Sequence, residues 1–516
     1  MALLEIDALD IRIAGRRVVE NISLRIEAGE THGLVGESGS GKSATALAIL
    51  QLLPAAACTA GVIRFAGQTL TSMTDADLIP LRGRDIGMIF QEPMTALNPL
   101  MSIGDQVAES ILAHTCAGRS QARGMARAVL ERVGLRAPQI SPDRYPHELS
   151  GGQRQRAAIA MAIVLSPKLL IADEPTTALD VVTQSEILDL LKRMIREDGS
   201  ALLLISHDLG VVARMTDRVA VLHEGRLVEQ GPTRAVLGGS TQAYTRSLIA
   251  ASRLGTLRAA AIRASAEPLL DVCDVVCEYA GIRAVDGVNL SVMRGESVGI
   301  VGESGSGKST LLRSILGVRA IQSGQIQLDG ESIALARGSR LRRLRRMIQC
   351  VFQDPAGSFD PRWPVARLIA EPLHLLDAPL TPREQRLKIH ALLERVGLRA
   401  ADAERRPHEF SGGQRQRIAI ARALIVEPAL IALDEAVSAL DVTTRAQILA
   451  LLAELSGSMG LGVVFVSHDL AVVRAITERV FVMERGRIVE SGTTAKVFDE
   501  PRHPYTASLV AATLKF

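Results

Sequence analysis

The chain has 516 residues, a formal net charge of +3 and 22% charged residues. This length is enough for two or more domains with their own cores, and the nearly balanced charge gives no electrostatic reason to expect a nucleic-acid partner. No 18-residue stretch lacks both charges and turn breakers, and the first residues include no basic segment, so we expect no transmembrane helix and no secretory signal.

The first predicted functional element is a glycine-rich loop after a short apolar strand at residues 31–35. Its pattern, GxxxxGK[ST], wraps backbone N–H groups around the phosphates of a nucleotide at the start of a helix, where the helix dipole favours negative charge. The lysine of such a loop reaches the β- and γ-phosphates, and the serine binds Mg²⁺. This phosphate loop consists of Gly36, Glu37, Ser38, Gly39, Ser40, Gly41, Lys42 and Ser43.

Polar residues follow other apolar strands further along. Gln91 comes after one strand, and the pair Asp173 and Glu174 ends another. A carboxylate at a strand end can hold the Mg²⁺ shell, and the next one can orient or deprotonate an attacking water. His207 ends a further strand, 34 residues after Asp173 (207 − 173). A predicted helix whose first N–H groups suit an anion begins with the signature segment, which includes Ser150, Gly151, Gly152 and Gln153.

The whole series recurs in the second part of the chain. The phosphate loop returns letter for letter 266 residues later (308 − 42), and the spacing from aspartate to histidine is again 34 (468 − 434). Such repetition predicts two homologous domains, which we place at residues 1–250 and 268–516, with an Ala/Arg-rich linker at 251–267. The second set consists of Gly302, Glu303, Ser304, Gly305, Ser306, Gly307, Lys308, Ser309, Gln353, Ser411, Gly412, Gly413, Gln414, Asp434, Glu435 and His468.

Each part alternates strands with helical stretches, which predicts an α/β fold with a parallel core. Residues 92–149 and 354–410 are expected to be helical. Residues 340–346 hold five arginines. We expect them to form a solvated helix face, with a lipid or nucleic-acid patch as the alternative.

This ordered set of motifs resembles the nucleotide-binding domains of ABC ATPases over almost the whole chain. The signature segment is the specific element, because many NTPases share a bare phosphate loop. Three short segments are similar to sequences of the peptide/nickel/opine importer branch. They are FQEP at 90–93, FQDP at 352–355 and HPYT at 503–506. The resemblance implies two tandem P-loop NTPase domains, each with a mixed or parallel sheet and a helical subdomain that contacts membrane subunits.

The resemblance also implies roles for the motif residues. The signature of one domain would face the γ-phosphate held by the other, so the domains would close head-to-tail. One site would join Lys42, Asp173 and Glu174 to Ser411, and the other would join Lys308, Asp434 and Glu435 to Ser150. The implied catalytic residues are Glu174, His207, Glu435 and His468, and the implied Mg²⁺ ligands are Ser43, Gln91, Asp173, Ser309, Gln353 and Asp434.

The two predicted ATP sites differ at one aromatic position. Tyr279 lies 16 residues before Gly295 (295 − 279) and suits stacking on adenine, whereas the matching position before Gly29 is Ile13 (29 − 13). Tyr279 could also be an ordinary strand aromatic.

We expect ATP and Mg²⁺ as cofactors and no iron–sulfur cluster. Some relatives in this branch carry a cysteine cluster after the HPYT segment, and this chain has none there. The five cysteines match no metal spacing and are expected to be reduced thiols. They are Cys58, Cys116, Cys273, Cys277 and Cys350.

Together these features predict the ATP-hydrolysing subunit of an ABC importer for peptides, or for nickel or related small solutes. It would lie on the cytoplasmic face of the membrane and work with two membrane permeases and an extracytoplasmic solute-binding protein. The alternatives are an export ATPase and a soluble tandem ABC ATPase acting on ribosomes or DNA. The linker is shorter than the charged arm typical of ribosome-acting members, and the zinc cysteine pairs of repair members are absent from the sequence.

Overall fold

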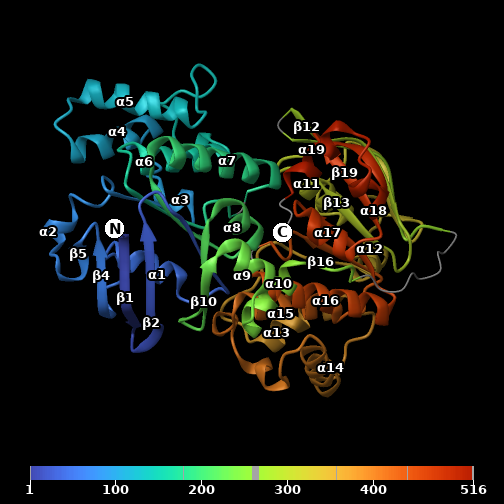
Figure 1. Ribbon diagram of the computed structural model, residues 1–516. Helices are drawn as coiled ribbons and strands as arrows, with labels where there is room; N and C mark the ends of the chain where they lie inside the picture. Colours follow the sequence, from blue (N-terminus) through green and yellow to red (C-terminus); the bar gives the residue numbers. More distant parts are fainter. Residues whose placement is uncertain are drawn as a thin grey trace.

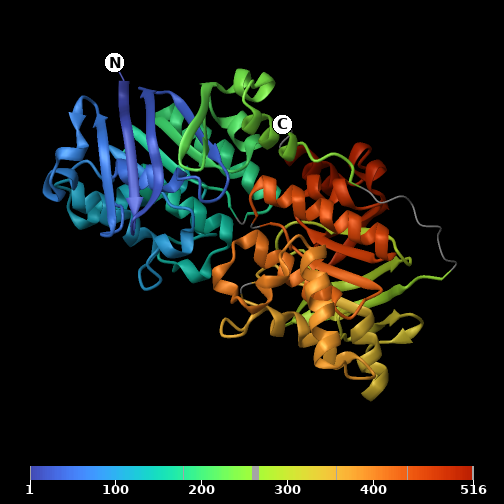
Figure 2. The same cartoon turned by 90° about the horizontal axis from the view of Figure 1, so that it is seen from below.

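The computed structural model describes residues 2–177, 179–257, 267–279, 281–355, 357–438 and 440–513. The same elements occur twice, in a first half that ends with helix α10 and a second half that begins with strand β11 (Figure 1). Seen from below, the halves lie side by side (Figure 2). Among the described residues, no helix is both long and apolar enough to span a membrane.

The first half contains two sheets. The central sheet has the order β10-β9-β3-β8-β7-β6 and is parallel except for β10, and a second, antiparallel sheet has the order β2-β1-β4-β5. The strands are β1 (Ala2–Ile13), β2 (Arg16–Glu27), β3 (Thr31–Gly36), β4 (Ala57–Phe65), β5 (Gln68–Thr69), β6 (Ile86–Ile89), β7 (Leu169–Asp173), β8 (Ala201–Ser206), β9 (Arg218–His223) and β10 (Arg226–Pro232).

The second half repeats both sheets, in the orders β16-β17-β18-β13-β19-β20 and β12-β11-β14-β15. Its strands are β11 (Leu270–Tyr279), β12 (Ile282–Val292), β13 (Ser297–Val301), β14 (Ser323–Leu328), β15 (Glu331–Ser332), β16 (Ile348–Val351), β17 (Leu430–Asp434), β18 (Gly462–Ser467), β19 (Arg479–Glu484) and β20 (Arg487–Thr493). The predicted α/β fold with a parallel core is therefore confirmed, while the antiparallel sheets were not predicted.

Helices surround these sheets. In the first half they are α1 (Lys42–Ile49), α2 (Asp75–Leu78), α3 (Pro93–Ala96), α4 (Ile103–His114), α5 (Arg119–Arg132), α6 (Gly151–Ile163), α7 (Val181–Asp198), α8 (Leu209–Met215), α9 (Thr233–Gly239) and α10 (Ala243–Ser252). In the second they are α11 (Lys308–Ile315), α12 (Gly338–Met347), α13 (Val365–Ala370), α14 (Pro382–Arg395), α15 (Gly412–Leu424), α16 (Val442–Met459), α17 (Leu470–Ile476), α18 (Thr494–Asp499) and α19 (Pro504–Ala512).

The segments between glutamine and signature are helical, as predicted. Helices α4 and α5 share one apolar cluster with α6, and α13 and α14 share one with α15. The arginine-rich segment is helix α12, which buries only Leu344 among its described residues. Both helical subdomains are thus anchored through the helix that begins within the signature segment.

The halves contact each other reciprocally. Helix α10 of the first half packs against α16 of the second, and α19 of the second packs against α7 of the first. After α10, Leu254 and Leu257 pack against the core of the second half, and the Leu257 N–H donates to the Ala475 carbonyl at 2.8 Å. The predicted linker begins inside α10, and its residues 258–266 lie outside the described residues.

Candidate functional site

Each phosphate loop joins a buried central strand to a helix. The helices begin at Lys42 and Lys308, after Gly41 with φ 98° and Gly307 with φ 106°. A Cβ on Gly307 would lie 2.1 Å from the Ala284 carbonyl oxygen, so only glycine fits there. This conformation lets the loop backbone come close to a ligand.

The lysines lie inside their own loops. Lys42 Nζ donates to the carbonyl oxygens of Gly36 at 2.8 Å and Glu37 at 2.7 Å. Lys308 makes the same two bonds at the same distances, to Gly302 and Glu303. Burial lowers the pKa of both amines, and nearby carboxylates oppose that shift. Each loop therefore holds a buried cation beside the place where phosphates would bind.

Asp173 is the last residue of β7, and Asp434 is the last residue of β17. Burial raises the pKa of both carboxyl groups. Asp173 Oδ1 is buried without a hydrogen-bond partner among the described residues, while Ser309 Oγ donates to Asp434 Oδ1 at 3.1 Å. An unpaired buried carboxylate oxygen is costly, and a divalent cation would satisfy it. The structure thus places the predicted serine and aspartate ligands where they fit Mg²⁺.

Clusters with three or more His, Cys, Asp or Glu side chains able to hold a metal ion do not occur in the described part of the chain. The predicted Mg²⁺ ligand sets contain serine and glutamine and only one carboxylate each, so they are not of this kind. The expectation that the protein has no iron–sulfur cluster stays a prediction.

Glu174 is held by three side chains. It accepts hydrogen bonds from Gln91 Nε2 at 3.1 Å and Thr177 Oγ1 at 2.9 Å, and it pairs with His207 Nδ1 at 2.9 Å. Burial alone would raise the pKa of Glu174, but its interactions with His207, the hydrogen bond from Thr177 and the charge of Lys42 together outweigh burial, and the pKa lies below its usual value. The carboxylate is therefore ionised at neutral pH.

Glu435 has the same glutamine and histidine partners, but Ser438 Oγ donates to its backbone carbonyl oxygen at 2.9 Å and not to its carboxylate. Gln353 Nε2 donates to it at 3.1 Å, and His468 Nδ1 lies 3.2 Å from its Oε1. Both glutamates have left-handed backbones, with φ 48° at Glu174 and 47° at Glu435. Such a backbone costs about 1–2 kcal/mol for a residue with a side chain. This backbone turns each glutamate side chain away from the strand direction, toward its glutamine and histidine partners.

A turn of each half faces the phosphate loop of the other half, which sequence reasoning missed. Thr177 and Asp180 of the first half line a cavity of about 380 Å³ together with Lys308, Glu435 and other residues of the second half. The charge of Asp180 raises the pKa of Lys308, and that of Asp441 raises the pKa of Lys42, in each case against the larger effect of burial. The sequence did contain a signal for this role, because Asp180 recurs as Asp441, 261 residues later (441 − 180).

The signature serines cap helices and are exposed. Ser150 Oγ accepts from the Gln153 N–H at 3.3 Å, and Gln153 Oε1 accepts from the Ser150 N–H at 3.0 Å. Ser411 and Gln414 form the same capping box. Ser150 is not among the described residues that line the cavity at Lys308. Within each half the structure therefore assembles loop, glutamine, acidic pair and histidine, but it does not bring the signature serine to the opposite loop.

Tyr279 and Ile13 occupy equivalent places, at the ends of strands β11 and β1. The Tyr279 side chain is 66% exposed, and the Arg319 guanidinium lies 5.1 Å from its ring centroid. Tyr279 is also not among the described residues lining the cavity at Lys308. Its role in stacking on adenine stays a prediction.

Two tyrosines outside the predicted site contact the phosphate loops. The hydroxyl of Tyr505 accepts a hydrogen bond from the Glu303 N–H at 2.9 Å, and that of Tyr244 accepts one from the Glu37 N–H at 3.4 Å. Burial raises the pKa of both hydroxyls to about 12. They belong to α19 and α10, the helices that pack on the opposite half. The pair Tyr-Thr occurs at 244–245 and again at 505–506, and this repetition was the sequence signal for a contact between these helices and the phosphate loops.

Comparison with known proteins adds an independent finding. The chain matches the family described as ABC transporter over residues 19–177 and 285–438, and the oligopeptide/dipeptide transporter C-terminal region over 489–516. It is 43% identical to the glutathione import ATP-binding protein GsiA of Salmonella typhimurium, covering 96% of this chain and 86% of that protein. It is 44% identical to the peptidoglycan transport ATP-binding protein YejF of Agrobacterium fabrum, covering 96% and 92%.

Among solved structures, cbiO1 from Clostridium perfringens is described as part of the ABC transporter complex cbiONQ. It is 31% identical, with a TM-score of 0.41, and the match covers 45% of this chain and 92% of that one.

The geometry predicts that Glu174→Gln with Glu435→Gln slows ATP hydrolysis by at least about 100-fold, the lower range for loss of a general base. ATP binding should persist, because neither glutamate belongs to a phosphate loop. Steady-state turnover and equilibrium binding of labelled ATP measure the two effects. Glu131→Gln, which changes an exposed carboxylate on α5, is the control and should leave both unchanged. Normal turnover in the double variant would remove these glutamates from the chemical step.

Proposed function

The chain belongs to the ABC transporter family, and on this premise we propose that it is the ATP-hydrolysing subunit of an importer for peptides or peptide-like solutes. The observation that carries this proposal is the pairing of two complete sets of ATP-site residues with a C-terminal region of the oligopeptide/dipeptide transporter kind. The reported relatives are named for glutathione import and peptidoglycan transport. These names favour a transport role over action on ribosomes or DNA.

At the first site, the loop around Lys42 would bind the phosphates of ATP. Ser43, Gln91 and Asp173 would hold Mg²⁺, which supplies positive charge to the β- and γ-phosphates when bound. Glu174, ionised and fixed by its partners, would orient the attacking water and accept its proton. His207 contacts Glu174 through Nδ1, so its Nε2 is the atom able to reach the γ-phosphate. The second site would use the equivalent residues of the second half.

We further propose that ATP closes the halves head-to-tail. The turn at Asp180 already faces the loop around Lys308, and the reciprocal packing of α10 and α19 keeps each half next to the other. Closure would bring the helix starts at Ser150 and Ser411 onto the γ-phosphate held by the opposite loop. Hydrolysis would remove that phosphate and release the halves, as in other switches driven by a γ-phosphate.

The partners in this proposal are two membrane permeases, contacted through the helical subdomains, and an extracytoplasmic solute-binding protein. The chain would then act as a peripheral subunit on the cytoplasmic face of the membrane. Solute specificity would reside in the partner subunits, so the choice of peptide is not determined by the ATP sites.

Composite sites predict a specific pattern in paired variants of the full chain. Lys42→Ala with Ser411→Arg damages one site twice, so one tight ATP per chain should remain. Lys42→Ala with Ser150→Arg damages both sites, so no tight ATP should remain. Both variants lose the same lysine and gain one signature arginine, which makes each the control for the other. Equal stoichiometry in the two variants, measured by equilibrium binding, would contradict the head-to-tail arrangement.

The aromatic difference predicts unequal sites. Stacking on an aromatic ring contributes about 1–3 kcal/mol per base, and 1.4 kcal/mol is about tenfold in affinity, so we expect the Lys308 site to bind ATP several-fold more tightly. Tyr279→Ala should weaken that site and Ile13→Tyr should strengthen the other, whereas Tyr145→Ala, at another exposed tyrosine, should change neither. Titration of the hydrolysis-blocked chain with labelled ATP separates the two affinities. If the two affinities are equal and Tyr279→Ala changes neither of them, Tyr279 has a structural role only.

A further inference from the structure

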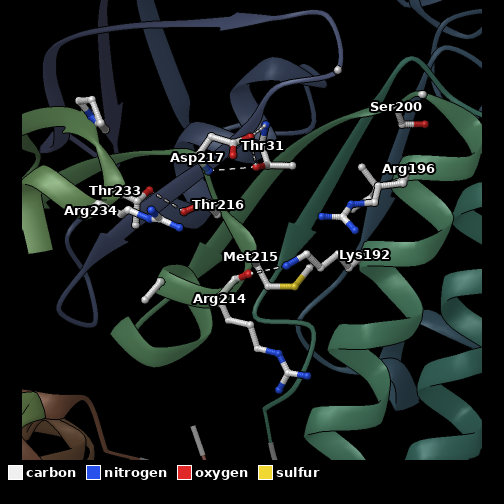
Figure 3. Close-up of a pocket in the computed structure, with 15 residues that line it drawn as sticks. Thr31, Lys192, Arg196, Ser200, Arg214, Met215, Thr216, Asp217, Thr233 and Arg234 are labelled. Atoms are coloured by element: carbon white, nitrogen blue, oxygen red, sulfur yellow. Dashed lines mark hydrogen bonds between the residues drawn. The ribbon is translucent and has the colours of Figure 1, made fainter. Parts of the chain in front are cut away.

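The first half contains a cavity of about 570 Å³ that the proposed mechanism does not use. Thr31, the first residue of β3, lines it, so the cavity lies at the opposite end of this strand from the phosphate loop. The last turns of α7 and α8 and the start of α9 form its other walls (Figure 3). Four cationic side chains and one carboxylate, that of Asp217, line this cavity. The cations are Lys192, Arg196, Arg214 and Arg234.

Two of the four cations are bound within the protein. Arg214 pairs with Asp189 at 2.6 Å, and Lys192 Nζ donates to the Arg214 carbonyl oxygen at 3.1 Å. Asp217 accepts a hydrogen bond from Thr31 Oγ1 at 2.7 Å. Lys192 therefore keeps its positive charge without a carboxylate partner among the described residues.

The side chains of Arg196 and Arg234 make no hydrogen bond or ion pair with any residue that the structure describes. Their guanidinium groups extend from opposite sides toward the middle of the cavity, and the Lys192 amine lies between them (Figure 3). The cavity thus presents three positive charges to one carboxylate. An arginine fork can bind a phosphate or carboxylate through two parallel hydrogen bonds.

The second half shows that the fold does not require these cations. Helices α7 and α16 both have 18 residues and end at a left-handed glycine, Gly199 or Gly460. The hydroxyl pair Thr216–Thr233 recurs as Thr477–Thr494, each at 3.0 Å. At the same offset of 261 residues, the positions of the four cations are occupied by Ala453, Gly457, Ala475 and Ala495.

A simpler explanation would be that the cations only stabilise the C-terminal ends of α7 and α8. Cations do favour helix C-termini. However, α16 forms with the same length and has no basic residue in its last turn. The carbonyl end of α7 therefore does not need the charges of Lys192 and Arg196 for the helix to form. Helix α17, the counterpart of α8, does carry a basic residue, Arg474, in its last turn, so Arg214 keeps the simpler explanation.

We propose that this cavity is a binding site for a small polyanion, a compound with at least two phosphate or carboxylate groups. Its volume lies within the range of small-molecule pockets, about 300–1,000 Å³, and its two unpaired guanidinium groups provide the recognition. Ala213 and Arg214 also line a second cavity, between α8 and α19 of the other half. A ligand in the cationic cavity would therefore lie beside the contact between the halves. This inference does not depend on the ATP sites.

The test uses the full chain with both phosphate loops saturated by a non-hydrolysable ATP analogue and Mg²⁺. Inorganic pyrophosphate and citrate are titrated separately by calorimetry. We expect at least one of them to bind, and Arg196→Ala with Arg234→Ala to weaken that binding at least about tenfold, because two charge-assisted contacts are lost. Binding of pyrophosphate alone identifies a phosphate ligand, and binding of citrate alone identifies a carboxylate ligand.

The control is Arg474→Ala with Lys496→Ala, which removes the same charge from the corresponding face of the second half and should change the affinity less than about twofold. Arg196 and Arg234 are exposed, so their variants should melt at the temperature of the parent, and Arg196→Gln with Arg234→Gln gives a second pair. Binding of neither probe, or equal weakening by the control, would overturn the proposal.

Discussion

Adjacent parallel strands end at one edge of each central sheet, and this places the ATP-site residues at the strand ends next to one another. The chemistry of the protein depends on that arrangement. In the order β3-β8-β7-β6, the strand ends carry the phosphate loop, His207, the acidic pair and Gln91 in turn. Functional groups far apart in the chain therefore meet within hydrogen-bond distance, as they do at the strand ends of other open α/β sheets. The left-handed backbone at Glu174 then turns its carboxylate toward Gln91 and His207 instead of continuing the strand.

This rule explains which features were predictable. Apolar runs such as 201–205 are buried along their whole length, so they predicted parallel strands correctly, and the motifs at their ends could be grouped in advance. The antiparallel sheet escaped prediction because β1 pairs with β2 through register shifts, one of them between Ile6 and Leu9, which interrupt the alternation of a simple strand. The roles of Asp180 and Tyr505 depend on contacts between distant segments. Their recurrence in both halves was a signal that they matter, but a local pattern does not show which distant segment a residue contacts.

The duplication lets each half serve as a control for the other. The bonds of Lys42 and Lys308 agree in length, and Glu174 and Glu435 each have a glutamine partner, a histidine partner and the same strained backbone. The halves differ in the cationic cavity and at the pair Tyr279 and Ile13. A feature kept in both halves belongs to the fold or the chemistry that they share, whereas a feature in one half needs a separate cause. Helix α16, which ends without a basic residue, shows that helix formation is not that cause for Lys192 and Arg196, the two cations on α7.

The central claim is that one ATP lies between the phosphate loop of one half and the signature segment of the other. Mg²⁺, ADP and orthovanadate can be trapped in the chain, and ultraviolet light then cuts the backbone next to the bound vanadate. The account predicts cuts near both phosphate loops and both signature serines. In Lys42→Ala, the cuts near residues 36–43 and Ser411 should disappear together, while those near 302–309 and Ser150 remain. Loss of the Ser150 cut instead, or cuts at the loops alone, would contradict the account.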